Sequence, residues 1–247
     1  AQLIRMKKLK VHNVKTLILD EADKLMDKTY LESIIFIRKS LMKRTQVLLF
    51  SASISNKTIK QANIITYNPV IYELSKENKE LIPKTIKHIF IISDRRERIE
   101  TLRKIAKAVN SDKTMIFINT KYDLEESLQK LQYHNYNVAA LAGNIDKQSK
   151  KKAVEDFQNG RLQYLLATDV AARGLQIDHV STVINVNLPE EPTEYLHRAG
   201  RCGRNNEQGL CISIITENEL NKIKKYQKAF NINIVQKRLY NGKIVSK

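Results

Sequence analysis

The sequence predicts an α/β protein built on doubly wound parallel sheets, with one complete domain and half of another. Short apolar runs of strand length alternate with longer segments in which apolar residues recur at helical spacing, as in parallel sheets covered by helices. The apolar runs are continuous, which indicates strands buried on both faces. At 247 residues the chain has room for one large domain or for one domain plus part of another.

The half domain is predicted to consist of residues 1–73. Residues 1–13 mix basic and apolar side chains, which indicates a short basic helix, and the apolar run that begins at Val14 and ends at Leu19 indicates a buried strand. A half sheet of this size should not fold well alone. The other predicted elements are an amphipathic turn after Asp23, a helix over about Leu31 to Leu41, a strand at 46–50, a helix at 55–65 with Ser55 as N-cap, and a short strand at 70–72.

Residues 84–247 predict the complete domain, after a linker at 74–83. The linker is polar and charged, lacks periodicity and ends at Pro83. Regular repetition of strands and helices beyond it predicts a parallel sheet with right-handed crossovers and helices on both faces. The predicted strands are 86–92, 115–118, 138–141, 164–167, 180–186 and 210–215. The predicted helices are 95–109, 123–134, 147–158, one from about Thr193 and one from Glu217.

The chain is strongly basic. Lys and Arg outnumber Asp and Glu by 43 to 26, a formal charge of +17, which predicts attraction to a polyanion such as nucleic acid. Charges scattered evenly over the surface would instead mean only a soluble basic protein. Cys202 and Cys211 are not spaced as a metal or redox pair, and no apolar run approaches the ~18 residues of a membrane span. We therefore expect a cytoplasmic protein with no membrane partner.

Three acidic side chains follow the first predicted strand. Asp20, Glu21 and Asp23 lie at its carboxyl end, where ligands bind in open α/β sheets. An Asp there can hold magnesium directly or through water, and a neighbouring Glu can orient or deprotonate an attacking water. The alternative is an acidic helix N-terminus that the helix dipole favours, without catalytic meaning. Because short motifs match by chance, the rest of the chain decides between these interpretations.

Three further motifs follow in order. Residues 51–53 are Ser-Ala-Ser after an apolar run, residues 168–174 are Thr-Asp-Val-Ala-Ala-Arg-Gly, and residues 197–204 are His-Arg-Ala-Gly-Arg-Cys-Gly-Arg. Together with Asp-Glu-Ala-Asp at 20–23, the set resembles the DEAD-box RNA helicases from about Val14 to about Lys237. The resemblance implies two RecA-like domains of the P-loop NTPase type, with ATP hydrolysis that RNA stimulates and that is coupled to local unwinding of an RNA duplex by domain closure.

The resemblance also implies roles in nucleotide chemistry. Asp20 would hold magnesium through its waters, Glu21 would activate the attacking water, and Asp23 would link to the other domain, where the family pairs it with His197. Arg201 and Arg204 match the family's arginine fingers, and their spacing of three projects both guanidinium groups the same way. The implied ATP-binding or coupling positions are Ser51, Ser53, Asp169, Arg173, Gly174 and Gln176.

RNA contact in this family runs along the sugar-phosphate backbone. Such contact needs cations, hydroxyls and backbone N–H groups rather than side chains that recognise bases. The basic cluster at 150–152 would by itself be an ordinary solvated face. The positions that the resemblance assigns to RNA are Thr120, Gly143, Gln148, Lys151 and Thr168.

Several features depart from the family pattern. Gln176 replaces an Asp that contacts the ribose, and Lys151 replaces an Arg, which loses bidentate phosphate geometry. Cys202 lies among arginines that could lower its pKa, which raises the hypothesis of a redox role. All seven glycines lie at or beyond Gly143, so no glycine-rich phosphate loop precedes Asp20.

We interpret the sequence as a fragment that lacks the amino-terminal part of its first RecA-like domain and that should not hydrolyse ATP alone. An ATP-independent relative is the alternative explanation for the missing loop. Two other functions stay open: an ATP-dependent RNA clamp or scaffold that unwinds little, and, for the piece as given, a simple basic RNA-binding module. Protein partners cannot be named from the sequence.

Overall fold

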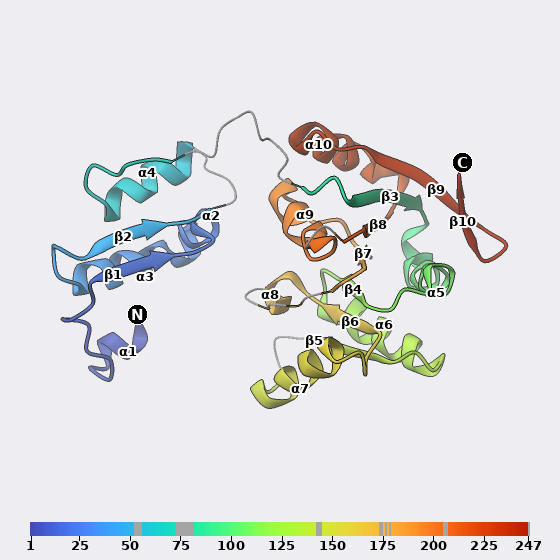
Figure 1. Ribbon diagram of the computed structural model, residues 1–247, viewed down its shortest axis with the longest axis horizontal. Coiled ribbons are helices and arrows are strands. Elements are labelled where there is room, and N and C mark those ends of the chain that lie inside the picture. Colours follow the sequence, from blue (N-terminus) through green and yellow to red (C-terminus); the bar gives the residue numbers. More distant parts are fainter. Residues whose placement is uncertain are drawn as a thin grey trace. The chain divides into compact units, whose positions relative to one another are not determined.

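The computed structural model describes residues 1–51, 56–72, 82–141, 145–172, 175, 177, 179–204 and 207–246. The chain divides into two compact units, Ala1–Glu77 (unit 1) and Asn78–Lys247 (unit 2), which are coloured from blue to cyan and from green to red in Figure 1. Both are α/β, and the sheet of unit 2 is almost entirely parallel, so the predicted fold class is confirmed. Among the described residues, no helix has the length and apolar character needed to cross a bilayer.

Unit 1 holds a two-stranded parallel sheet. Strands β1 (Thr16–Leu19) and β2 (Gln46–Leu49) pair with Thr16 opposite Gln46. Their inward side chains pack on a small core formed by Leu19, Met26, Ile34 and Ile65. The helices are α1 (Gln2–Arg5), α2 (Ala22–Leu25), α3 (Lys28–Ser40) and α4 (Asn56–Ile65).

Burial in β1 alternates, so the prediction of a strand buried on both faces is wrong. Leu19 is 5% exposed, whereas its neighbour Ile18 is 58% exposed. Phe50, which follows β2, is also 55% exposed. The physical reason is that the core of the unit lies on one face of this sheet, so successive side chains point alternately into it and away from it.

The short basic helix predicted within residues 1–13 is α1, which ends at Arg5, shortly before Lys7 adopts a positive φ of 56°. The predicted turn after Asp23 and the helix that follows it are α2 and α3, which are separated because Asp27 has an extended backbone (φ −74°, ψ 158°). A further prediction for unit 1 is wrong, because Val70–Tyr72 forms no strand. Its side chains are 50–88% exposed, and no described strand lies beside it to supply ladder hydrogen bonds.

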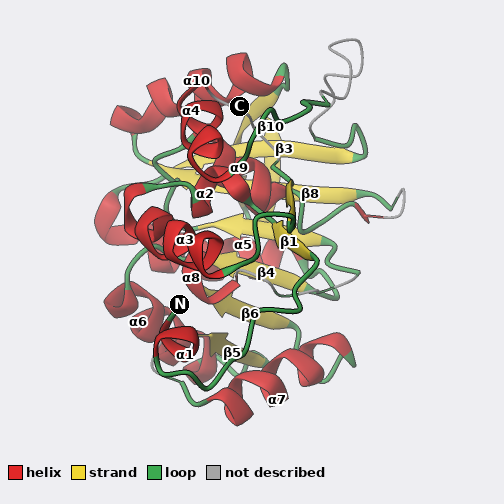
Figure 2. Cartoon of the chain, turned by 90° about the vertical axis from the view of Figure 1, so that its left-hand side faces the viewer, coloured by secondary structure: helices red, strands yellow, loops and turns green. Residues whose placement is uncertain are grey.

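Unit 2 is built on an eight-stranded sheet in the order β10-β9-β3-β8-β7-β4-β6-β5. Every pair is parallel except β10 with β9. Figure 2 shows the strands in yellow, with β5 and β6 at one edge and β3 and β10 toward the other. The strands are β3 (Ile86–Ile92), β4 (Thr114–Phe117), β5 (Val138–Leu141), β6 (Tyr164–Ala167), β7 (Thr182–Asn185), β8 (Gly209–Ile215), β9 (Ile234–Tyr240) and β10 (Lys243–Ser246).

Helices cover both faces of this sheet, as predicted. One core joins α7, α9 and α10 to one face through residues such as Phe157, Tyr195 and Tyr226. The other core joins α5 and α6 to the opposite face through Leu102 and Leu124. The helices are α5 (Arg98–Val109), α6 (Lys121–Tyr133), α7 (Lys147–Gln158), α8 (Asp169–Ala172), α9 (Pro192–Ala199) and α10 (Leu220–Phe230), with 3-10 turns η2 (Arg95–Glu97) and η4 (Glu217–Glu219).

The hairpin of β9 and β10 extends unit 2 beyond the last predicted helix. Its turn consists of Asn241 and Gly242, which have positive φ angles of 46° and 73°. Both values fit a two-residue type I′ turn, for which Asn-Gly is the preferred pair. The Asn-Gly pair between two apolar runs was therefore the signal that could have predicted this hairpin.

His88 is a buried histidine at the centre of unit 2. It is 5% exposed in β3, and its Nδ1 lies 2.8 Å from the hydroxyl oxygen of Tyr195 in α9. Burial lowers the pKa of His88 from 6.5 to about 4, because desolvation penalises the charged ring. The neutral imidazole therefore belongs to the folded state.

The stability of unit 2 should fall between about pH 6.5 and pH 4. The depressed pKa means that the unfolded chain takes up a proton from the solvent before the folded chain does, so acid favours unfolding. His88 contributes on the order of 3 kcal/mol to this loss. Urea unfolding followed by circular dichroism at several pH values measures it. The variant His88→Gln should show a flatter dependence in this window, and an unchanged slope would contradict the prediction.

Candidate functional site

The acidic motif of unit 1 lies where β1 ends. Asp20 follows the strand directly, and its Oδ1 accepts a hydrogen bond of 2.9 Å from the backbone N–H of Glu21. Glu21 has a left-handed backbone (φ 51°, ψ 47°) and is the N-cap residue of α2. Its Oε2 lies 3.3 Å from Nζ of Lys24. The predicted position of these carboxylates at the carboxyl end of the strand is confirmed.

Ser51 connects the end of β2 to this motif. The carbonyl oxygen of Phe50 accepts a hydrogen bond of 2.9 Å from the N–H of Ala22, and Ser51 Oγ accepts one of 3.3 Å from the N–H of Asp23. The serine hydroxyl and the acidic turn are thereby held together at the same edge of the small sheet. Ser53 lies outside the described residues.

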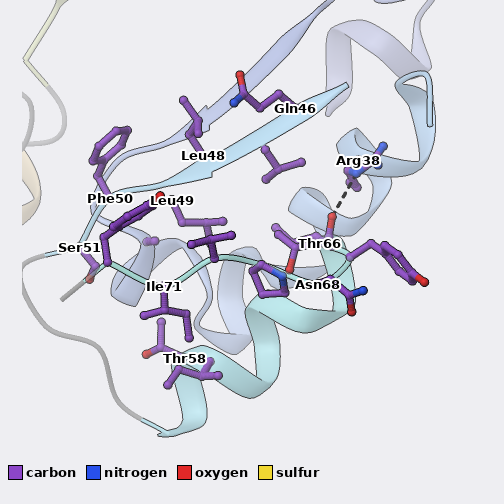
Figure 3. Close-up of a pocket in the computed structure, with 18 of the residues that line it drawn as sticks. Arg38, Gln46, Leu48, Leu49, Phe50, Ser51, Thr58, Thr66, Asn68 and Ile71 are labelled. Carbon is purple, nitrogen blue, oxygen red and sulfur yellow. Dashed lines mark hydrogen bonds between the residues drawn. The ribbon is translucent and has the colours of Figure 1, made fainter. Parts of the chain in front are cut away.

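A cavity of about 750 Å³ runs along the edge of β2 that faces away from β1. Figure 3 shows Gln46, Leu48 and Phe50 along one wall and Asn68 and Ile71 along the other. At one end Arg38 Nε donates a 3.1 Å hydrogen bond to the carbonyl oxygen of Ile65. No described strand pairs with this edge of β2, so its backbone groups line the cavity.

Two threonines of unit 2 lie at the carboxyl ends of the neighbouring strands β4 and β6. Thr120 Oγ1 accepts a 3.1 Å hydrogen bond from the N–H of Asp123 at the start of α6. Thr168 Oγ1 accepts a 3.3 Å bond from the N–H of Ala171 in α8. Because β4 and β6 pair in parallel, with Phe117 opposite Ala167, both hydroxyls lie at one edge of the sheet.

The start of α7 adds exposed polar groups after the next strand, β5. Its N-cap residue Asp146 accepts hydrogen bonds of 2.9 Å from the N–H groups of Gln148 and Ser149. Lys151 is 78% exposed and lies 3.6 Å from Glu155, a contact that solvent weakens. Gln148 is also exposed, so both predicted RNA-contact side chains of α7 are accessible. Gly143 lies outside the described residues.

The motif 197–204 begins in the last turn of α9, where His197 is half-buried. Arg201 Nη1 donates a 2.7 Å hydrogen bond to the carbonyl oxygen of Leu175, and Arg204 Nη1 donates one of 3.4 Å to that of Ile177. The two guanidinium groups therefore contact the same segment after α8, which agrees with the prediction that they project the same way. Arg173, Gly174 and Gln176 in that segment lie outside the described residues.

Gly203 explains why this motif cannot be an ordinary helix. Its φ is 67°, and a Cβ added there would lie only 2.6 Å from Cγ1 of Ile86 in β3. A residue with a side chain would therefore be strained by its backbone and would collide with the sheet. The glycine brings Arg204 back against the end of α9, where its Nε donates a 3.1 Å hydrogen bond to the carbonyl oxygen of Gly200.

Arg198 is the residue that the sequence interpretation missed. Its side chain is 1% exposed and all five of its N–H groups donate hydrogen bonds. Nε and Nη2 bind the two carboxylate oxygens of Asp169 at 2.7 and 2.6 Å. The other acceptors are Oδ1 of Asn119 at 2.8 Å, the carbonyl oxygen of Asn187 at 2.7 Å and Oδ1 of Asn185 at 3.3 Å.

The structure contradicts the hypothesis of a reactive Cys202. The side chain is 1% exposed, and burial raises the pKa of its thiol far above the usual value. Cys211 is also buried, and desolvation raises its pKa to about 11. A thiol that stays protonated and inaccessible is a poor nucleophile. Desolvation by burial is the largest cause of the raised pKa of Cys202, so arginines that are adjacent in the sequence do not make this thiol reactive.

The residues of unit 1 fit a magnesium site only with help from a phosphate ligand. Within the described part of the chain, no three His, Cys, Asp or Glu side chains gather as a metal site. Magnesium needs only one or two carboxylates when phosphates and water complete its coordination, so the exposed Asp20 fits this role. The sequence contains no glycine-rich loop to cradle the phosphates themselves.

Models of two protein families match the chain, one in each unit. Residues 97–206 match the model of the helicase conserved C-terminal domain. Residues 1–62 match the model of the DEAD/DEAH box helicases.

Two bacterial relatives match nearly the whole chain. It is 33% identical to the DEAD-box ATP-dependent RNA helicase CshC of Bacillus cereus over 245 residues, and this aligned stretch covers 99% of this chain and 62% of CshC. It is 31% identical to the probable ATP-dependent RNA helicase YfmL of Bacillus subtilis over 246 residues, and this aligned stretch covers 100% of this chain and 64% of YfmL. The chain thus spans less than two thirds of the length of these relatives.

Solved structures give the same result. Saccharomyces cerevisiae Dbp5 bound to RNA and ADP BeF3 has a TM-score of 0.87 and 29% identity, over 96% of this chain and 63% of that one. Mss116p bound to single-stranded RNA and AMP-PNP has a TM-score of 0.79 and 27% identity, over 92% of this chain and 48% of that one.

Proposed function

Because this chain belongs to the DEAD-box family of helicases, we propose that it supplies the catalytic acidic groups, the arginine fingers and much of the RNA-binding surface of an ATP-dependent RNA helicase. The observation that carries the proposal is that each unit presents charged groups of opposite sign directly after one of its regular elements. Asp20 and Glu21 follow β1, while Arg201 and Arg204 follow α9. Closure of the two domains would bring both sets to one triphosphate and bend the bound RNA strand.

Each group has a role that its chemistry suits. Asp20 would hold a hydrated magnesium ion, which neutralises charge on the phosphates when it is bound. Glu21 would orient the attacking water and accept its proton. Arg201 and Arg204 would exchange their carbonyl acceptors for the phosphate oxygens, where charge develops during transfer and a planar cation binds more strongly. Asp23 and His197 would link the two domains, with Ser51 and Ser53 sensing closure.

The cavity beside β2 supports a proposal for how the phosphates are cradled. A further parallel strand in that space would pair with the open edge of β2 and would end beside Ser51, near Asp20. A glycine-rich loop after such a strand would place its N–H groups on the phosphates. Since this sequence carries no such loop, we expect the 247-residue chain alone not to hydrolyse ATP.

The direct test is ATP hydrolysis by the full-length protein, measured with and without single-stranded RNA and compared with the separation of a short RNA duplex. The proposal expects RNA to raise the turnover and the duplex to separate only with ATP. An RNA clamp that unwinds little is the second candidate, because Gln176 stands where the family has an Asp. Strong hydrolysis without strand separation would favour the clamp, and turnover that RNA does not change would contradict both.

The carboxyl edge formed by Thr120, Thr168 and the start of α7 is proposed to bind the RNA backbone. Gln148 and Lys151 are exposed there, and Gly143 belongs to the same set by sequence. These positions supply hydroxyl, amide and cationic groups, which suit phosphates and 2′-hydroxyls rather than bases. RNA-bound and nucleotide-bound forms of Dbp5 and Mss116p support RNA and ATP as the ligands.

Replacing Lys151 with Ala should weaken binding of single-stranded RNA to the 247-residue chain. Loss of one phosphate contact should reduce the slope of log K against log salt concentration by about 0.7. The expected change is the same for RNAs of different sequence. Fluorescence anisotropy at several salt concentrations measures it. The matched control is Lys107→Ala on α5, which packs on the opposite face of the sheet from α7. Equal salt dependence of RNA binding in the two variants would show that Lys151 is not part of the proposed RNA-binding surface.

A further inference from the structure

Arg198 joins two groups of residues that the proposed function treats separately. It contacts Asn119, which precedes Thr120, and Asp169, which follows Thr168. These two threonines are the proposed RNA contacts at the ends of β4 and β6. Three residues after Arg198 comes Arg201, the first proposed arginine finger. One buried guanidinium therefore contacts the neighbours of both proposed RNA contacts and belongs to the helix end that leads to the first proposed arginine finger.

The same helix end attaches a whole segment to itself through three arginines. Arg198 binds the carboxylate of Asp169, Arg201 binds the carbonyl oxygen of Leu175, and Arg204 binds that of Ile177. The three arginines and their three acceptors therefore follow one another in the same order along the chain. A displacement at the start of α8 would therefore also shift the acceptors of Arg201 and Arg204, the two proposed arginine fingers.

The geometry of Arg198 suits transmission rather than simple packing. A guanidinium is planar, and here all five N–H groups have acceptors from strands β4, β6 and β7 or the residues that follow them. Its ring-face contact with Phe117, 5.1 Å from the ring centroid, restrains it further. A buried charge cannot leave an acceptor without a large penalty, so a shift of Asn119 or Asp169 must move the guanidinium with it.

We propose that Arg198 is a positioning residue that couples RNA contact at Thr120 and Thr168 to the placement of Arg201 and Arg204 on the nucleotide. This inference rests on the proposed helicase function. Arg198 touches neither RNA nor ATP in this role. RNA contact shifts the ends of β4 and β6, the guanidinium follows through Asn119 and Asp169, and the last turn of α9 carries the movement to the finger arginines.

The variant Arg198→Lys tests this coupling in the full-length protein. Lysine keeps the charge but loses the bidentate bond to Asp169 and the simultaneous bond to Asn119. We expect the factor by which RNA stimulates kcat to fall about tenfold or more, within the range of coupling between sites. RNA affinity measured without nucleotide should stay within about threefold, because the contact residues are intact. Loss of RNA affinity and stimulation in equal proportion would indicate a merely structural role.

A second pair of variants keeps the test valid if Arg198→Lys unfolds. Asn119→Ala removes the link to β4 and leaves the ion pair of Arg198 with Asp169 in place. Asn119→Asp keeps an acceptor for Arg198 but loses the 3.2 Å hydrogen bond that the amide nitrogen of Asn119 donates to the carbonyl oxygen of Leu188, so it should restore part of the stimulation. Equal stimulation in wild type, Asn119→Ala and Asn119→Asp would overturn the proposal.

The matched control is Arg103→Lys. Arg103 also binds both oxygens of one carboxylate, that of Glu100, but on α5, on the other face of the sheet. Its stimulation factor should equal that of wild type, and an equal fall in both lysine variants would overturn the coupling role. If RNA fails to stimulate the wild-type enzyme, the proposed function itself fails. If the wild type responds and Arg198→Lys responds equally, only the coupling role fails.

Discussion

Replacing Arg201 with Ala should abolish RNA-stimulated ATP hydrolysis by the full-length protein, with a fall in kcat of about 10³-fold or more. The reason is that charge develops on the phosphate oxygens during transfer, and a guanidinium stabilises it most in a site that excludes water. Arg201 suits this role because its guanidinium and that of Arg204 both donate hydrogen bonds to the same segment of unit 2. Steady-state hydrolysis at saturating RNA and ATP measures the effect.

The control separates this loss from a general loss of positive charge. Arg161 follows α7, and its exposed guanidinium pairs with Asp156 of that helix. The variant Arg161→Ala removes this guanidinium, and its kcat should stay close to that of wild type. RNA binding without nucleotide should survive in Arg201→Ala, because the proposed RNA contacts are elsewhere on the sheet edge. Turnover in Arg201→Ala within a few-fold of wild type would remove the finger assignment.

Replacing Glu21 with Gln should lower the rate of the chemical step by about 10²- to 10⁴-fold. The amide has nearly the same shape as the carboxylate but cannot accept a proton from the attacking water. The fold should be preserved, since the side-chain change removes only the partly exposed ion pair with Lys24, and such pairs contribute little to stability. Single-turnover hydrolysis of preloaded ATP isolates this step from nucleotide binding.

Glu32→Gln is the matched control for this variant, because Glu32 is an exposed glutamate on α3 of the same unit. It should hydrolyse ATP at the wild-type rate. Binding of RNA and ATP should remain in Glu21→Gln, and the variant should hold RNA longer when hydrolysis no longer reopens the domains. A chemical step that proceeds equally fast in both variants would exclude Glu21 as the base.

The local sequence pattern was sufficient to predict most of the strands and helices of unit 2. The strands at 86–92, 138–141 and 164–167 and the helix at 147–158 have the predicted bounds. These segments are strongly periodic or continuously apolar, and the sheet and helices that they form bury the side chains that the pattern marks. Their local preference and their tertiary environment agree.

Prediction failed where the outcome depended on a neighbour far away in the chain. Residues 70–72 have strand-like side chains, but a strand needs a partner, and no described strand lies beside them. Cys202 lies among arginines in sequence, whereas in space its sulfur is surrounded by the core, and desolvation decides its pKa. Both errors came from reading a non-local property from adjacent residues.

The sequence by itself determined the family, because four motifs in a fixed order need no coordinates to be recognised. It also determined which residue types stand at strand ends. Only the tertiary structure decided that Arg198 is buried and that Asn119, Asp169 and Asn185 all meet on it. These acceptors lie in β7 or just after β4 and β6, three strands that other elements separate in the chain and that are neighbours in the sheet. Adjacency of strands is set by packing of the whole domain, so no local pattern could have predicted it.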